Sequence, residues 1–106
     1  MIEIVETHVF TRIIQDYLDD SEYRALQWAL VARPDQGTVI PGGNGLRKLR
    51  WVLQGRGKRG GLRILYYWDR EASAVYMLYA YSKGEQGDLT RAQLRALAKL
   101  IEEELQ

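Results

Sequence analysis

Five polar residues in the second half of the chain have the types and spacing to act on a phosphate. Lys48 and Arg50 are two residues apart in an alternating, strand-like run, so both should point to the same face of a sheet. Arg63 begins the next such run, and Tyr81 and Lys83 close the one after it. A sheet face where these residue types converge without a carboxylate suits a polyanion. It could stabilise the extra charge of a phosphorane-like transition state, and a tyrosine or a lysine there could transfer protons.

These residues belong to a wider basic stretch from Leu46 to Trp68. No acidic residue lies between Asp35 and Asp69, although the chain as a whole has a net charge of only +1. A chain that is almost neutral overall but locally this basic should present one positive face, and the natural partners of such a face are phosphates. An ordinary solvated charge run is the other interpretation. The stretch holds seven of the 15 basic residues: Arg47, Lys48, Arg50, Arg56, Lys58, Arg59 and Arg63.

Other kinds of active site find little support in the sequence. The chain has one histidine, His8, and no cysteine, so we expect no metal centre and no thiol nucleophile. The glycines at 42, 43 and 45 lack the lysine and the serine or threonine of a phosphate-binding P-loop. The paired acids at Asp19–Asp20 and at Glu102–Glu104 lie at helix ends. We therefore expect no metal and no cofactor.

Length and composition indicate one domain spanning residues 1–106, with a hydrophobic fraction of 46% that is sufficient for a core. The N-terminus carries Glu3 and Glu6 and does not have the pattern of a signal peptide. No segment approaches the roughly 18 apolar residues that a membrane span requires. We therefore expect a cytoplasmic protein without a membrane partner.

The first third of the chain predicts a strand and two helices. Ile2 to Glu6 is a short β-branched run. Thr7 is a candidate N-cap for a helix whose apolar residues, from Phe10 to Leu18, follow helical spacing. Asp19 and Glu22 form a capping-box pattern for a second helix, which ends before Pro34. These two helices form a hairpin that can cover one face of a sheet.

The remainder predicts a sheet followed by a helix. Residues 34–45 contain two prolines and four glycines and are expected to be a connecting loop. Three strand-like runs follow, at residues 46–53, 62–68 and 74–81, and they predict an antiparallel meander. Thr90 and Gln93 have capping-box spacing ahead of a last amphipathic helix. The expected fold class is α+β, in the order β-α-α-β-β-β-α, with a helical hairpin and a C-terminal helix around a small, mainly antiparallel sheet.

Three segments of the chain, together with this element order and size, resemble a known family. The segments are GLRKLRW (45–51), GGLRILYYW (60–68) and YMLYAYSKGEQGDLT (76–90). They are similar to the RelE/ParE toxin superfamily, and within it to the HigB-like branch of type II toxins. The resemblance covers nearly the whole chain. Its most specific part is the first two segments with the basic glycine loop between them.

The resemblance implies the toxin half of a bacterial type II toxin–antitoxin system. RelE-like members are mRNA interferases: they cut mRNA in the ribosomal A site and thereby inhibit translation. This metal-independent endoribonuclease reaction proceeds by 2′-OH attack to a 2′,3′-cyclic phosphate. The implied catalytic residues are Lys48, Arg50, Arg63, Tyr81 and Lys83, and the implied RNA-binding residues are Arg47, Arg56, Lys58 and Arg59. RelE has a further tyrosine in its last segment, where this chain reads GDLTRAQ, so Tyr81 is the nearest candidate.

The implied partners are the ribosome, mRNA and a cognate antitoxin, often one with a helix-turn-helix domain. Two alternatives share parts of this pattern. A ParE-like toxin would inhibit DNA gyrase by binding alone, but ParE-like members lack the dense set of phosphate-binding residues. A catalytically silent nucleic-acid-binding module would use the same basic face without cleaving its ligand.

Overall fold

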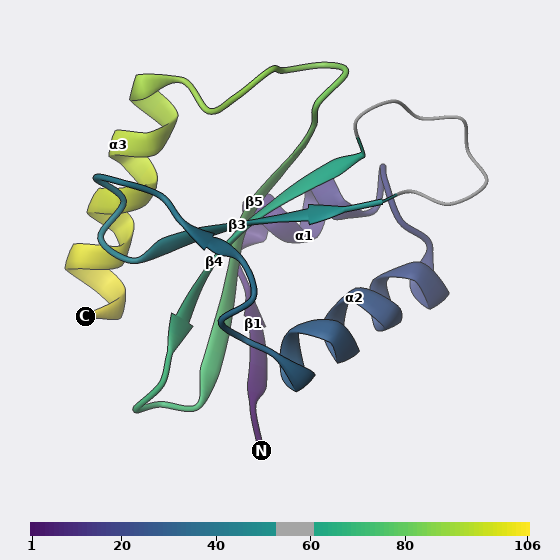
Figure 1. Cartoon of the computed structure of the whole chain (residues 1–106), viewed down its shortest axis with the longest axis horizontal. Coiled ribbons are helices and arrows are strands. Elements are labelled where there is room, and N and C mark those ends of the chain that lie inside the picture. Colours follow the sequence, from purple (N-terminus) through teal and green to yellow (C-terminus); the bar gives the residue numbers. More distant parts are fainter. Residues whose placement is uncertain (53–60) are drawn as a thin grey trace.

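The computed structural model describes residues 1–52 and 61–106, and it has an α+β architecture. Figure 1 shows one strand, two helices, a run of strands and a last helix in chain order. The elements are β1 (Glu3–Glu6), α1 (His8–Ile14), α2 (Asp20–Ala32), β2 (Thr38–Val39), β3 (Leu46–Trp51), β4 (Leu62–Asp69), β5 (Ala74–Ser82), α3 (Arg91–Leu100) and a π-helical turn, η1 (Ile101–Leu105). No helix among these residues is long and apolar enough to cross a membrane.

The five strands form one mixed sheet in the order β1-β5-β4-β3-β2. The segment β3-β4-β5 is the antiparallel meander that the sequence predicts. β1 joins the outer side of β5 in parallel, with Glu3 paired with Ala74. A parallel neighbour requires a long crossover connection, and here the crossover comprises both helices, β2, β3 and β4.

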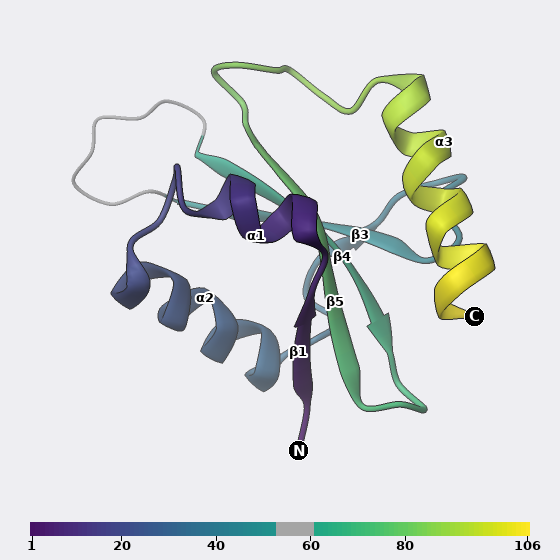
Figure 2. The same cartoon turned by 180° about the vertical axis from the view of Figure 1, so that it is seen from behind.

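The sheet separates two apolar layers. Helices α1 and α2 cover one face, as Figures 1 and 2 show together, and their core includes the fully buried residues Phe10, Leu26 and Ile64. Helix α3 covers part of the other face, where Leu65 and Ile101 are fully buried. Because side chains alternate between the faces of a strand, successive residues of β3 and β4 belong to different layers.

Side-chain caps fix the starts of the helices where the sequence predicts them. The Thr7 hydroxyl accepts a hydrogen bond from the Phe10 amide. Asp19 and Glu22 form a reciprocal capping box at α2, and Thr90 and Gln93 form another at α3. Each box satisfies two amides that a helix start leaves unpaired.

Two details differ from the sequence-based expectation. The connector 34–45 is not entirely loop, because Thr38 and Val39 pair with Lys48 and Arg47 and add an edge strand to the sheet. Helix α1 ends at Ile14 instead of continuing to Leu18. The amide of Leu18 still bonds the Ile14 carbonyl at 2.9 Å, so the turn after the helix keeps Leu18 buried.

Candidate phosphate-binding site

A row of polar side chains crosses strands β3, β4 and β5 near one end of the sheet, on the α3 side. Arg50 on β3 is paired in register with Arg63 on β4, and Arg63 is paired with Tyr81 on β5. Lys48 has the same orientation as Arg50, since it lies two residues away on the same strand. The meander therefore brings four of the five expected catalytic residues to one face.

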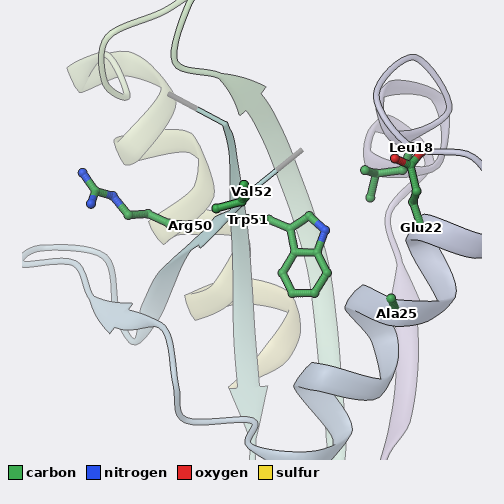
Figure 3. Close-up of a pocket in the computed structure, with 6 residues that line it drawn as sticks. All are labelled: Leu18, Glu22, Ala25, Arg50, Trp51 and Val52. Atoms are coloured by element: carbon green, nitrogen blue, oxygen red, sulfur yellow. The ribbon is translucent and has the colours of Figure 1, made fainter. Parts of the chain in front are cut away.

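Figure 3 makes this alternation visible at the end of β3. The side chains of Arg50 and Trp51 leave the strand in opposite directions, and Trp51 points toward α2. A pocket of about 490 Å³ lies on the α2 side, lined by Leu18, Glu22, Ala25, Arg50, Trp51 and Val52. Arg50 contributes to its edge while directing its guanidinium away from the helix layer.

Burial differs along the row. The Arg63 side chain is only 5% exposed, whereas Arg50 is exposed. Tyr81 is also buried, with 3% of its surface exposed. Arg63 thus forms the floor of the site, and Arg50 and the half-exposed Lys48 provide its accessible positive charge.

Lys83 lies one residue beyond the end of β5. Its backbone amide donates a 3.2 Å hydrogen bond to the Gly61 carbonyl, so the pairing of β5 with the start of β4 continues past Ser82. The Lys83 residue is exposed. The structure places it at the same end of the sheet as the row, on the segment that leads toward α3.

The expectation that this face carries no carboxylate is wrong. Asp88, in the loop between β5 and α3, places its Oδ1 3.6 Å from the Lys48 ammonium. The same oxygen accepts a long, 3.4 Å hydrogen bond from the Tyr81 hydroxyl and a 2.8 Å bond from the Leu89 amide. Asp88 was missed because nothing in the strand periodicity places a loop residue. The one available signal was an acidic residue two positions before the N-cap residue of a capping box.

Asp88 and Tyr81 perturb each other's ionisation. Burial raises the pKa of Tyr81, and the adjacent Asp88 carboxylate raises it further. The Leu89 amide and then the Lys48 charge lower the pKa of Asp88. Tyr81 is therefore held in its neutral, hydrogen-bond-donating form and Asp88 in its ionised form.

A small pocket adjoins Lys48 and Asp88. It has a volume of about 240 Å³ and lies between the β2 segment and the start of α3. Its walls are mainly apolar, and Lys48 and Asp88 supply the charged groups. The lining residues are Thr38, Val39, Ile40, Pro41, Lys48, Asp88, Leu89 and Leu94.

Arg47 does not join this face. Its guanidinium donates hydrogen bonds to the carbonyls of Asp35 and Gly37, at 3.0 and 2.8 Å, and so fixes the loop that follows α2. The other three expected RNA-binding residues, Arg56, Lys58 and Arg59, lie outside the described residues. Among the described residues, no group of histidine, cysteine, aspartate and glutamate side chains could hold a metal ion.

Comparison with known proteins identifies the fold. No protein-family model matches the chain. Among solved structures, it is similar to a chain of the intact E. coli RelBE toxin–antitoxin complex, with a TM-score of 0.58 and 12% sequence identity. The match covers 77% of this chain and 96% of that chain. At this level of identity the likeness shows a shared fold, and it confirms that the chain has the RelE-like α+β fold that its sequence segments suggest.

Proposed function

We propose that this protein is the toxin of a type II toxin–antitoxin pair and that it cleaves mRNA on the ribosome. The observation that carries this proposal is the cross-strand row Arg50–Arg63–Tyr81, with Lys48 beside it, on a RelE-like fold. Neighbouring cations on a rigid sheet are preorganised to stabilise charge on a phosphate. The proposal follows the resemblance of the sequence segments to the RelE/ParE superfamily.

The reaction is an internal transfer at phosphorus. The ribose 2′-oxygen forms a bond to the adjacent phosphorus while the bond from phosphorus to the 5′-oxygen breaks. The 2′-hydroxyl loses its proton and the departing 5′-oxygen gains one, which leaves a 2′,3′-cyclic phosphate and a 5′-hydroxyl. Negative charge grows on the phosphate oxygens during this step. Lys48 and Arg50 would contact those oxygens, and Arg63 would contribute positive charge from below.

Tyr81 suits proton donation better than proton abstraction. Its raised pKa, caused first by burial and then by Asp88, keeps the hydroxyl protonated at neutral pH. A protonated phenol can donate to a phosphate oxygen or to the departing 5′-oxygen. We therefore assign Tyr81 to hydrogen-bond or proton donation and Lys83, at the exposed rim, to phosphate contact.

The pocket beside Lys48 supports a nucleic-acid substrate. Its apolar walls, which include Val39, Pro41 and Leu94, can pack against the face of an unpaired base while the neighbouring cations hold its phosphate. Binding of single-stranded nucleic acid commonly combines these two kinds of contact.

The proposal also includes a protein partner. The similar E. coli complex contains a toxin together with an antitoxin. We infer a cognate antitoxin for this chain, of the helix-turn-helix type that the resemblance to the toxin superfamily implies. It would neutralise the protein in the cytoplasm until the toxin is released to act on translating ribosomes.

The direct test is primer extension on mRNA during in vitro translation, with and without the purified protein. We expect new 5′ ends when the wild-type protein is added, and a loss of about a hundredfold in cleavage rate for Lys48→Ala, on the scale of removing one transition-state donor. Lys99→Ala is the matched control, because Lys99 is exposed on α3 and the substitution removes the same charge.

The same preparation discriminates the alternatives. If transcripts stay intact and the protein alters DNA supercoiling in a gyrase assay, the proposed nuclease activity is wrong and the protein is a gyrase inhibitor. RNA binding without cleavage would indicate a silent binding module. Lys48 is preferred over Arg63 for the test because Arg63 is buried, so its replacement could unfold the sheet.

A further inference from the structure

The Asp88 carboxylate stands among the groups that would receive an RNA phosphate. We propose that Asp88 is an internal counter-anion, which occupies the phosphate position between Lys48 and Tyr81 in the free protein and leaves when RNA binds. The inference rests on the proposed function, because it assumes that the ligand of this face is a phosphate of single-stranded RNA.

The geometry matches the replacement of one anion by another. Oδ1 of Asp88 lies 3.6 Å from the ammonium of Lys48 and 3.4 Å from the hydroxyl of Tyr81. Both partners are donors at neutral pH, and both donate to phosphate oxygens as readily as to carboxylate oxygens. A phosphate that displaced this one oxygen would satisfy both donors.

The two sides of the contact differ in how firmly they are held. Lys48 and Tyr81 project from paired positions in the sheet, so their backbone is fixed. Asp88 belongs to the loop between β5 and α3, which Figure 1 shows running from the end of β5 to α3. Rotation of the Asp88 side chain would clear the position without disturbing a strand.

The contact is also weak enough to be displaced. The Asp88 side chain is 75% exposed and the Lys48 side chain 33% exposed. Ion pairs with this degree of exposure contribute little to stability, and both distances are long for a strong charge-assisted bond. Rotation also breaks the 2.8 Å bond that Oδ1 accepts from the Leu89 amide, but that bond is exposed. Water can therefore solvate both the amide and the Asp88 carboxylate after displacement.

An RNA phosphate that approached while Asp88 remained in place would meet a like charge. The repulsion therefore lowers the affinity of the protein for RNA that is free in solution. RNA held beside the protein at high effective concentration, as on a ribosome, would overcome the same repulsion. Asp88 would thus favour binding of RNA that the ribosome holds beside the protein over binding of RNA that is free in solution.

The test is RNA binding by Asp88→Asn, which removes the charge and keeps the shape. The probe is a 2′-O-methyl RNA hexamer, which cannot undergo 2′-OH attack, titrated in low salt and followed by the NMR signals of Lys48 and Tyr81. Glu71→Gln is the matched control: it removes one exposed acid from the β4–β5 turn, at the opposite end of the sheet. We expect Asp88→Asn to bind roughly fivefold more tightly, on the scale of one like-charge contact near 4 Å in water, and Glu71→Gln to match wild type.

Three results would overturn the inference. They are unchanged or weaker binding by Asp88→Asn, an equal gain by Glu71→Gln, and no binding at these residues by any variant. These outcomes are separate from the fate of the proposed function. Cleavage by wild type with unchanged Asp88→Asn binding would refute the counter-anion alone. Tighter Asp88→Asn binding without cleavage by wild type would refute the nuclease alone.

Discussion

Arg50 and Arg63 occupy directly opposite positions on two antiparallel strands. Like charges at such positions destabilise a sheet, and one of these two residues is almost fully buried. A fold selected for stability alone would place an apolar or oppositely charged residue here. Two cations held side by side on paired strands suit the binding of an anion such as a phosphate.

Arg50→Gln should therefore stabilise the free protein while impairing its activity. We expect the free energy of unfolding to rise by about 0.2–1 kcal/mol, the range for a cross-strand pair, and mRNA cleavage to fall. Urea unfolding and primer extension measure the two effects. Arg70→Gln, in the β4–β5 turn, is the control and should change neither. A less stable Arg50→Gln protein would contradict the repulsion.

Tyr66→Phe should destabilise the fold without touching the site. The buried Tyr66 hydroxyl donates to the Pro34 carbonyl at 2.8 Å and accepts from the Gly37 amide at 2.9 Å. Its loss leaves a buried amide unpaired, which costs about 1–3 kcal/mol. Urea unfolding provides the measurement. Tyr67→Phe serves as the control, since its hydroxyl accepts an exposed, 3.4 Å hydrogen bond from the Gln106 side chain. Equal losses in the two variants would argue against the assigned hydrogen bonds.

Gly61→Ala should disturb the end of the sheet that carries the site. Gly61 has a positive φ of 64°, and an added Cβ would lie 2.7 Å from the Trp51 carbonyl oxygen. Gly42→Ala has a similar φ of 78° but open space around the new Cβ, so it should cost only the left-handed backbone penalty of about 1–2 kcal/mol. We expect a clearly larger loss of unfolding free energy for Gly61→Ala. The loss of stability should be accompanied by reduced mRNA cleavage, because the Gly61 carbonyl accepts a hydrogen bond from the amide of Lys83, one of the expected catalytic residues. Equal losses of unfolding free energy in the two variants would show that the backbone moves to avoid the contact with the Trp51 carbonyl.

Alkaline pH should weaken the contact between Tyr17 and Glu85. The Tyr17 hydroxyl donates a hydrogen bond to the Glu85 carboxylate. Burial, together with this bond and the Glu85 charge, raises the pKa of Tyr17 to about 12. The unfolded chain ionises near its ordinary pKa of about 10, so the contribution to stability is complete below about pH 10 and is lost as the pH rises toward 12.

The measurement is the free energy of unfolding at about pH 9 and about pH 12 in wild type and in Tyr17→Phe. The loss between the two pH values should be smaller in the variant. Glu85→Gln keeps the phenol and removes the acceptor charge, so spectrophotometric titration should show a lower Tyr17 pKa than in wild type. An identical alkaline loss in wild type and Tyr17→Phe would exclude Tyr17 as its source.

Much of the fold follows from local rules. The capping boxes at Asp19 and Thr90 and the meander of β3, β4 and β5 were all predicted, because each depends on spacing within a few residues. Strand β2 was missed because two residues, Thr38 and Val39, become a strand only through pairing with β3. The early end of α1 was missed as well, since its apolar spacing continues to Leu18 beyond the last helical residue.

The candidate site was predictable only in part, for a related reason. Alternation along one strand places Lys48 and Arg50 on the same face, and both lie in β3 of the structure, two residues apart. The pairing of Arg50 with Arg63 depends on the register between β3 and β4, and alternation within each strand does not determine that register. Asp88 reaches the site from an irregular loop, where it meets Lys48 at 3.6 Å, and strand alternation does not predict the path of such a loop.

The parallel pairing of β1 with β5 also bears on how this chain is made. Glu3 pairs with Ala74, and the Thr7 hydroxyl donates to the Leu78 carbonyl, so β1 is synthesised well before β5, the strand on which it docks. Contacts this distant in sequence slow folding. A nascent chain that stops before Tyr81 also lacks the last side chain of the polar row, which lies near the end of β5. The protein would therefore complete both its sheet and its polar row only late in its own synthesis.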